Sequence, residues 1–157
     1  MFFILRRLEL VIVIEKILFP VDLSESVNSF IPYVVTMTRK FNATLYIATV
    51  TPDVSSITSF FVPHTDIRSL QYEVQQGAAH HIKALADRLE GVERVEVCVL
   101  VGDPADQIID LARQEEIDLI IMGTRGRSGL QKSIFGSVCD RVIRSAICPV
   151  FTISPMD

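Results

Sequence analysis

The sequence has few cysteines, and their number and spacing are typical neither of a disulfide-stabilised protein nor of a zinc-binding protein. Cys98, Cys139 and Cys148 are the only three in 157 residues, and no two of them form a CxxC pair. An odd number without paired spacing argues against a disulfide framework and against a zinc site. Such cysteine usage is typical of a protein that works in the reducing cytoplasm.

The sequence also lacks long runs of basic or apolar residues. Its net charge is -4 and lysine and arginine are scattered, so we expect no nucleic-acid partner. Residues 1–13 are mostly apolar, but Arg6, Arg7 and Glu9 interrupt them, whereas a membrane span needs about 20 successive apolar residues. We expect no membrane span and interpret residues 1–13 as an appendage to a domain over residues 14–154. A membrane-surface or partner-docking segment is the alternative for residues 1–13.

Several common binding and catalytic motifs are absent. A Walker A loop needs Gly-Lys-Ser/Thr together, but here Lys132 and Ser133 follow Gln131. The dinucleotide-binding G-x-G-x-x-G and the hydrolase G-x-S-x-G are missing as well. His80 and His81 are adjacent, whereas a zinc pair on a helix needs i,i+4 spacing. We therefore expect no catalytic residue and no metal ligand from the chain itself.

What is present is a regular alternation of short apolar runs with stretches of helical spacing. Asp103 and Pro104 are typical of an N-cap and a first helical position, and Ser24 is a candidate N-cap with Pro32 as a helix kink. The alternation predicts a single-domain α/β fold with an open parallel sheet and right-handed crossovers. The expected strands are 15–22, 43–50, 92–102, 117–123 and 148–154, and the expected helices are 24–41, 67–90, 103–116 and 137–146.

Residues 51–66 are expected to form a long loop. They contain two prolines, many hydroxyl side chains and the apolar triplet Phe60, Phe61 and Val62. Loops of this length in compact domains are often functional. The triplet either caps the core of the domain or belongs to a lid whose order depends on a ligand.

A glycine-rich stretch at 122–138 is the strongest candidate for a binding site. Gly123, Gly126, Gly129 and Gly136 lie between an apolar run and a helix, with arginines among them. Glycine is costly in a folded chain unless a special backbone angle or a close approach requires it. The helix that starts after Gly136 offers free N–H groups and a positive dipole end to an anion such as phosphate. A surface loop with turn glycines is the alternative.

A second candidate lies at the end of the first expected strand. A strand order of 3-2-1-4-5 would make the first and fourth strands neighbours where the order reverses, and ligands of open α/β sheets bind beyond the carboxyl ends at such points. Asp22 and Gly123 would then face one crevice. A carboxylate beside a glycine backbone suits the hydroxyls of a ribose.

Taken together, these segments resemble the universal stress protein family. The spacing Gly123-x2-Gly126-x9-Gly136-Ser137 resembles the G-x2-G-x9-G-S/T signature of its ATP-binding branch. Residues 16–25, 101–104 and 148–153 resemble its first strand, the glycine before its third helix and its last strand. The resemblance implies a Rossmann-like, adenine nucleotide alpha hydrolase-like sheet of five parallel strands with helices on both faces, in the order 3-2-1-4-5. It also implies ATP with Mg²⁺ at the carboxyl edge and a homodimer through the last strand.

The resemblance also implies roles for single residues. Pro20 and Val50 would contact the adenine, Asp22 and Gly123 the ribose, and Gly126, Gly129, Gly136, Ser137 and Val138 the phosphates. Cys139 stands where some members of the family carry threonine. The complete candidate set is Pro20, Val21, Asp22, Val50, Met122, Gly123, Arg125, Gly126, Arg127, Gly129, Gly136, Ser137, Val138 and Cys139.

The sequence leaves three alternative functions. The first is an ATP-binding regulator in the stress response, cytoplasmic, acting on an unknown protein partner. The second is a weak ATP hydrolase or phosphotransferase, which would need a base to activate water, and the sequence offers no candidate. The third is a dimeric interaction module without nucleotide, against which the intact glycine signature speaks.

Overall fold

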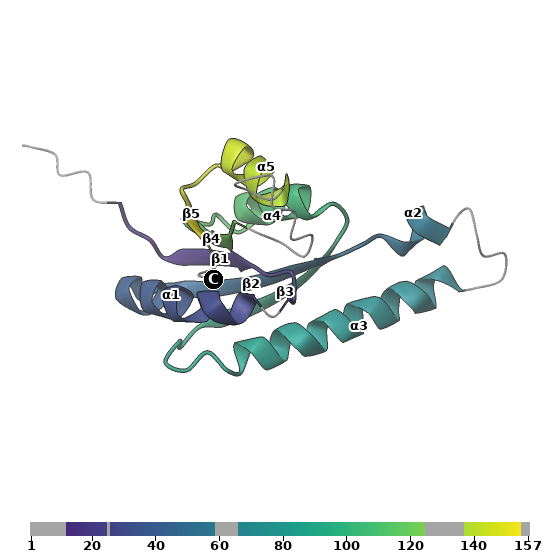
Figure 1. Cartoon of the computed structure of the whole chain (residues 1–157), viewed down its shortest axis with the longest axis horizontal. Coiled ribbons are helices and arrows are strands. Elements are labelled where there is room, and N and C mark those ends of the chain that lie inside the picture. Colours follow the sequence, from purple (N-terminus) through teal and green to yellow (C-terminus); the bar gives the residue numbers. More distant parts are fainter. Residues whose placement is uncertain (1–11, 25, 59–65, 125–136, 155–157) are drawn as a thin grey trace, which may run out of the picture.

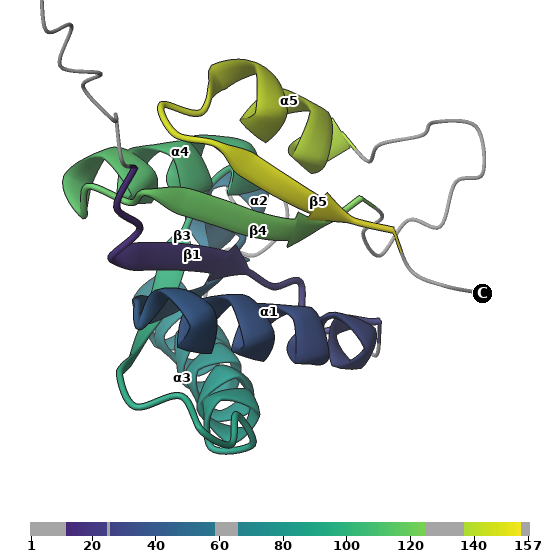
Figure 2. The same ribbon diagram turned by 90° about the vertical axis from the view of Figure 1, so that its left-hand side faces the viewer.

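The computed structural model describes residues 12–24, 26–58, 66–124 and 137–154. Five parallel strands form one sheet in the order β3-β2-β1-β4-β5, so the predicted fold class and strand order are confirmed. Helices cover both faces of the sheet, with α1 and α3 on one side and α4 and α5 on the other (Figures 1 and 2). The strands are β1 (Lys16–Pro20), β2 (Thr44–Thr51), β3 (Val95–Val101), β4 (Leu119–Gly123) and β5 (Val150–Ile153).

The helices and strands lie close to where the apolar spacing predicts them, and most bounds differ by a few residues. Helix α3 ends at Ala86 instead of residue 90, the third strand begins at Val95 instead of residue 92, and a short helix, α2, occupies part of the expected loop 51–66. Residues 59–65 of that loop, including the Phe60–Val62 triplet, lie outside the described residues. The helices are α1 (Val27–Phe41), α2 (Val54–Thr58), α3 (Ile67–Ala86), α4 (Pro104–Gln114) and α5 (Ser137–Ser145).

The N-cap of α1 is not Ser24, as predicted, but Ser26. The Ser24 side chain is used one turn earlier, where its Oγ donates to Asp22 Oδ1 at 2.6 Å. By contrast, Asp103 caps α4 as predicted, because its carboxylate accepts the N–H groups of Ala105 and Asp106. Helix α1 continues through Pro32.

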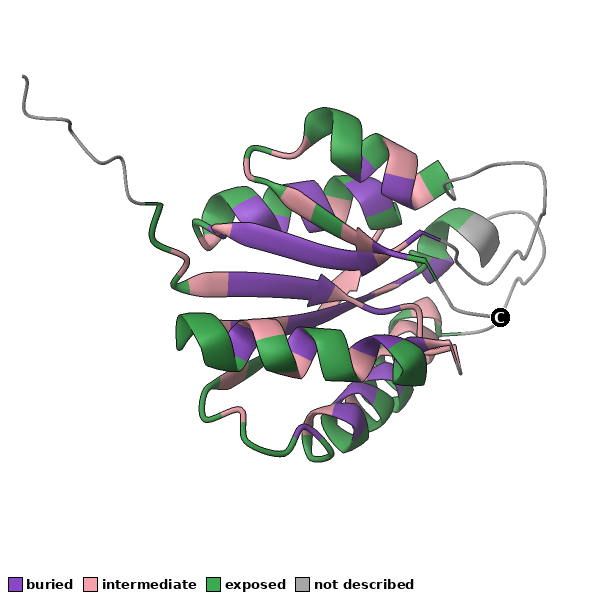
Figure 3. Cartoon of the chain, turned by 60° about the vertical axis from the view of Figure 1, so that its left-hand side comes forward, coloured by how far each residue is buried: buried purple, intermediate pink, exposed green. Residues whose placement is uncertain are grey.

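The sheet separates two apolar clusters because successive strand residues point to opposite faces. The first, here called the α1–α3 core, contains Ile17 and Phe19 of β1. The second, the α4–α5 core, contains Leu18 of the same strand. Figure 3 shows the result: the central strands are buried, and α1, α3, α4 and α5 each have a buried stripe toward the sheet and an exposed outer side. In the described part of the chain, no helix combines the length and apolar character needed to cross a membrane.

Candidate functional site

The carboxyl ends of β1 and β4 lie side by side, as the strand order requires. The two strands pair in parallel, with Ile17 opposite Leu119 and Leu18 opposite Ile120. The chain therefore leaves β1 toward Asp22 and leaves β4 toward Thr124 at the same edge of the sheet. This is the reversal point of the strand order, where ligands of open α/β sheets bind.

The turn after β1 is fixed by a network around Asp22. The Asp22 Oδ1 accepts a hydrogen bond from the Ser24 N–H at 3.0 Å and another from its Oγ at 2.6 Å. Leu23, between them, has φ 60°, a left-handed conformation that is unusual for a side chain of this size. Val21 N–H donates to the Ala48 carbonyl at 2.8 Å, which ties the turn to the neighbouring strand. Asp22 is therefore held in a fixed, half-buried place at the carboxyl edge.

Four apolar candidates share the α4–α5 face of this edge. Met122 and Cys139 are members of the α4–α5 core, and the half-buried Val50 and Val138 pack against it. Pro20 joins them on this face, since it lies two residues after Leu18 in the same strand. The structure therefore brings candidates from β1, β2, β4 and α5 to one side of the sheet.

Val21 and Gly123 face the other side. Val21 belongs to the α1–α3 core, with Phe30 of α1. A Cβ built on Gly123 would lie 2.5 Å from Phe30 Cε2 and 2.7 Å from Cζ. The glycine at the end of β4 thus has a packing role, which the sequence pattern does not reveal, because only contact with a residue of another element creates it.

Helix α5 starts at the same edge. Ser137, its first residue, is exposed, and the first turn of any helix has backbone N–H groups without helical partners. Arg125, Gly126, Arg127, Gly129 and Gly136 precede this turn and lie outside the described residues. Their assignment to phosphates remains a prediction.

Arg141 fixes α5 to α4, a contact that the sequence pattern does not predict. Its guanidinium donates to Asp103 Oδ1 at 2.8 Å and to Asp106 Oδ1 at 2.5 Å. The N–H of Asp106 and, to a lesser extent, the Arg141 charge lower the pKa of Asp103, so this carboxylate is ionised at neutral pH. The N-cap of α4 thereby also positions the helix that begins at Ser137. An acidic first turn in α4 and an arginine four residues into α5 are the only sequence traces of this contact.

The thiol of Cys139 does not face solvent. The residue is 3% exposed, and burial, together with the neighbouring Asp140 carboxylate, raises the pKa of its thiol to about 11. All three cysteines are free. The structure therefore places Cys139 as a small core residue whose backbone, not its side chain, is available at the start of α5. In the described ranges, no three His, Cys, Asp or Glu side chains gather as metal ligands do.

A parallel five-stranded sheet with a capped turn after β1 and a helix start after β4 defines an α/β protein with a ligand edge. The model of the universal stress protein family matches residues 14–154, and the chain belongs to that family. The universal stress protein MJ0531 of Methanocaldococcus jannaschii is 32% identical to it over 141 residues, which are 88% of this chain and 81% of that protein.

Solved structures share the fold along nearly the whole chain. The structure of MJ0577, from the same archaeon, has a TM-score of 0.79 and 25% identity, covering 94% of this chain and 99% of that one. Universal stress protein UspA from Lactobacillus plantarum has a TM-score of 0.70 and 27% identity, covering 88% and 97%. Two further structures of the same fold, each 23% identical, are complexes: a universal stress protein with cAMP and one from Archaeoglobus fulgidus with dAMP.

Proposed function

We propose that this universal stress protein binds ATP with Mg²⁺ at the carboxyl edge of its sheet and acts as a nucleotide-dependent regulator in the stress response. The observation that carries the proposal is the start of α5. Ser137 closes the glycine signature in the sequence, and α5 packs on the face that holds Val50, Met122 and Val138. The phosphate end and the apolar end of one nucleotide would thus find partners on a single face.

The described residues fit the three parts of an adenine nucleotide. Val50 and Val138 are half-buried apolar side chains suited to the flat face of a base, and Pro20 ends the central strand beside them. The anchored carboxylate of Asp22 suits the hydroxyls of a ribose. The first-turn N–H groups of α5 and the Ser137 hydroxyl suit phosphate oxygens. Mg²⁺ would be bound through those phosphates.

The cAMP and dAMP complexes of proteins with this fold support an adenine nucleotide as the ligand class. ATP itself is proposed from the spacing of Gly123, Gly126, Gly136 and Ser137, which resembles the signature of the ATP-binding branch of the family.

Substitution of the signature glycines tests the phosphate assignment. Gly126→Val and Gly136→Val are expected to weaken ATP binding at least about tenfold, or 1.4 kcal/mol, in a calorimetric titration. Gly77→Val is the matched control, because Gly77 is exposed in α3 and a Cβ added there would have no new neighbour within 4 Å. Folded Gly126→Val and Gly136→Val proteins that bind ATP as tightly as the parent would show that the assignment is wrong.

The fate of bound ATP distinguishes a regulator, which retains the nucleotide, from an enzyme, which hydrolyses it. Purified protein held with labelled ATP is expected to retain it as ATP, because the sequence offers no candidate base to activate water. Steady release of ADP that is lost in Gly136→Val would instead identify a hydrolase.

We further propose that the chain forms a homodimer through β5 in the cytoplasm. Among the described residues, β5 pairs with β4 alone and is therefore an edge, and Phe151 on it is 41% exposed. Exposed apolar edges tend to pair, and a two-fold axis covers both at once. Phe151→Lys is expected to give monomers in light scattering, whereas Tyr72→Lys on α3 leaves the dimer intact. Ile153 is buried in the α1–α3 core and is left unchanged. A parent protein that is monomeric at about 50 μM would contradict the dimer.

A further inference from the structure

A cavity on the α1–α3 side of the molecule is lined by none of the candidate residues named above. It has a volume of about 330 Å³ and lies between the turn after β1, the start of α1 and the end of α3. Its apolar lining comes from Leu23, Val27 and Leu85, of which Val27 and Leu85 are members of the α1–α3 core. The proposed nucleotide face lies on the other side of the sheet, so this cavity is a separate place. We call it the α3 pocket.

In the described part of the chain, the polar lining of the α3 pocket contains the cation of Arg88 and no carboxylate. His81 and Arg88 come from α3 and the turn after it, and Ser24 and Asn28 complete the rim. Within the described residues, neither the His81 ring nor the Arg88 guanidinium makes a hydrogen bond or an ion pair. The nearby Asp87 pairs with Lys83, on the same helix. An arginine that opens onto an apolar cavity without a carboxylate partner suits an anionic group, which its planar fork binds with two hydrogen bonds.

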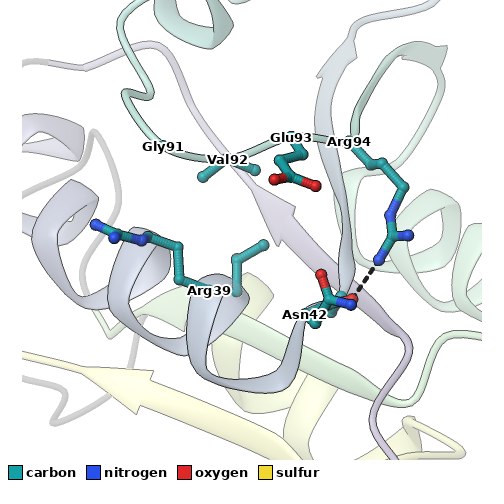
Figure 4. A pocket seen from close by; sticks show the side chains of 8 residues that line it. Arg39, Asn42, Gly91, Val92, Glu93 and Arg94 are labelled. Carbon is teal, nitrogen blue, oxygen red and sulfur yellow. Dashed lines mark hydrogen bonds between the residues drawn. The ribbon is translucent and has the colours of Figure 1, made fainter.

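A second cavity of similar volume provides the contrast. It lies at the opposite edge of the sheet, where α1 ends and β3 begins, and Arg39, Glu93 and Arg94 are among its lining residues (Figure 4). There the guanidinium of Arg94 already donates to the Asn42 carbonyl, and the Glu93 carboxylate lies in the same lining. Its cationic charge is thus partly used within the protein, whereas that of the α3 pocket is not.

We infer that the α3 pocket binds a small organic anion, with a carboxylate or phosphate on Arg88 and His81 and a compact apolar body on Leu23, Val27 and Leu85. The cavity volume is at the lower end of the range for small-molecule sites, roughly 300–1,000 Å³, so the apolar body is about the size of one ring. His80 has no part in it. The His80 ring lies edge-on to that of His81, with centroids 6.1 Å apart, but only His81 lines the pocket.

The same pocket is connected to Asp22, and this step rests on the proposed nucleotide function. Leu23 and Ser24 line the pocket, while the N–H and Oγ of Ser24 hold the Asp22 carboxylate. An anion that contacts Ser24 therefore acts on the turn that positions Asp22 toward the nucleotide. Binding at the two places is coupled, and by linkage each ligand changes the affinity of the other by the same factor.

Benzoate tests the pocket directly, with benzamide as a neutral control of the same shape. In a titration followed by amide NMR, benzoate is expected to shift the signals of Leu23, Ser24 and Asn28 saturably, with a Kd of about 1 mM or below. Inorganic phosphate, which lacks the apolar body, and benzamide, which lacks the charge, are expected to bind at least about tenfold more weakly. Equal affinity for benzoate and benzamide, or no saturation by benzoate, would overturn the inference.

A pair of variants near the C-terminal end of α3 assigns the contact. Arg88→Gln is expected to weaken benzoate binding at least about tenfold, whereas Lys83→Gln, whose partner is Asp87, leaves it unchanged. Both positions are exposed, so both variants are expected to fold. Equal losses in the two variants would show that general charge, not the pocket, attracts the anion.

The coupling is read from ATP titrations with and without saturating benzoate. The Kd for ATP is expected to change at least about threefold in the parent and not in Arg88→Gln. An unchanged Kd for ATP in the parent would overturn the coupling. If the parent binds no ATP at all, the proposed function fails, while the benzoate titration still decides on the pocket.

Discussion

The two faces of the sheet are built differently at its carboxyl edge, although the same strands supply both. On the α1–α3 face, the Phe30 ring closes over Gly123, and a Cβ there would lie 2.5 Å from it. On the α4–α5 face, the edge ends in half-buried Val50 and Val138 and in the first turn of α5. The first face is closed by packing at Gly123, and its cavity, the α3 pocket, lies beside the turn after β1. The second face presents apolar surface beside free backbone N–H groups. A nucleotide at this edge is therefore expected on the α4–α5 side.

Gly123→Ala is the substitution with the largest expected effect on this difference. The new methyl group must displace the buried Phe30, and such overpacking costs about 1–3 kcal/mol in the free energy of unfolding. Chemical denaturation measures the loss. Phe30→Leu in the Gly123→Ala background is expected to recover part of it, because the two changes relieve each other.

Gly77→Ala is the control for Gly123→Ala. Gly77 lies in the middle of α3, and a methyl group added there would have no new neighbour within 4 Å, so alanine is expected to stabilise the protein by about 0.5–1 kcal/mol. Equal effects of alanine at the two glycines would show that Phe30 does not seal the α1–α3 face.

Removal of the contact between Arg141 and α4 tests whether ATP binding on the α4–α5 face requires α5 to be fixed to α4. Arg141 is about half exposed, so Arg141→Gln is expected to change the free energy of unfolding by less than about 1 kcal/mol. Its effect on ATP affinity is expected to be larger than on folding, a roughly threefold rise in Kd measured by calorimetry, because the start of α5 is no longer fixed to α4.

Arg144→Gln is the matched control on the same helix. Arg144 pairs with Asp140 one turn away within α5 and does not reach α4. Its replacement is expected to leave the Kd for ATP unchanged. Equal changes in the two variants would mean that helix charge, and not the position of α5, matters to the nucleotide.

The smallest expected effect concerns the buried thiol of Cys139, which reports on the core beneath the α4–α5 face. Its folded-state pKa of about 11 is above the ordinary value of 9.0, so the neutral thiol is the form that folding favours. The stability that this burial contributes is fully present below pH 9.0 and is lost as the pH rises toward 11. Iodoacetamide at neutral pH is expected to label Cys98 and Cys148, which are half-buried, well before Cys139. Fast labelling of Cys139 would show that the first turn of α5 opens.

The Asp103 cap and the parallel α/β class could be predicted from the sequence because each depends on local pattern. The strand order, and with it the edge position of β5, was an expectation from the resemblance to the universal stress protein family. The N-cap of α1 could not be predicted, because Ser24 and Ser26 are both good capping residues. In the structure Ser24 Oγ binds Asp22, and Ser26 takes the N-cap position without a side-chain cap hydrogen bond. The helical stripe at 67–90 continues beyond Ala86 in the sequence, but the chain turns before Gly91, whose φ is 78°.

The candidate site could be predicted only in part. Its position at the ends of β1 and β4 follows from the strand order, which the resemblance to the family implied. The face on which each residue lies, the contact of Phe30 with Gly123 and the bond of Arg141 to Asp103 depend on elements far apart in the sequence.

Amide NMR with Mg²⁺ and ATP tests the central claim most directly, because it reports on both faces in one titration. Saturable shifts are expected at Asp22, Val50, Val138 and Cys139, while the signals of Ala78 and Ile82, buried on the α1–α3 side, stay in place. The absence of saturable shifts, or shifts confined to the α1–α3 side, would contradict a nucleotide site on the α4–α5 face.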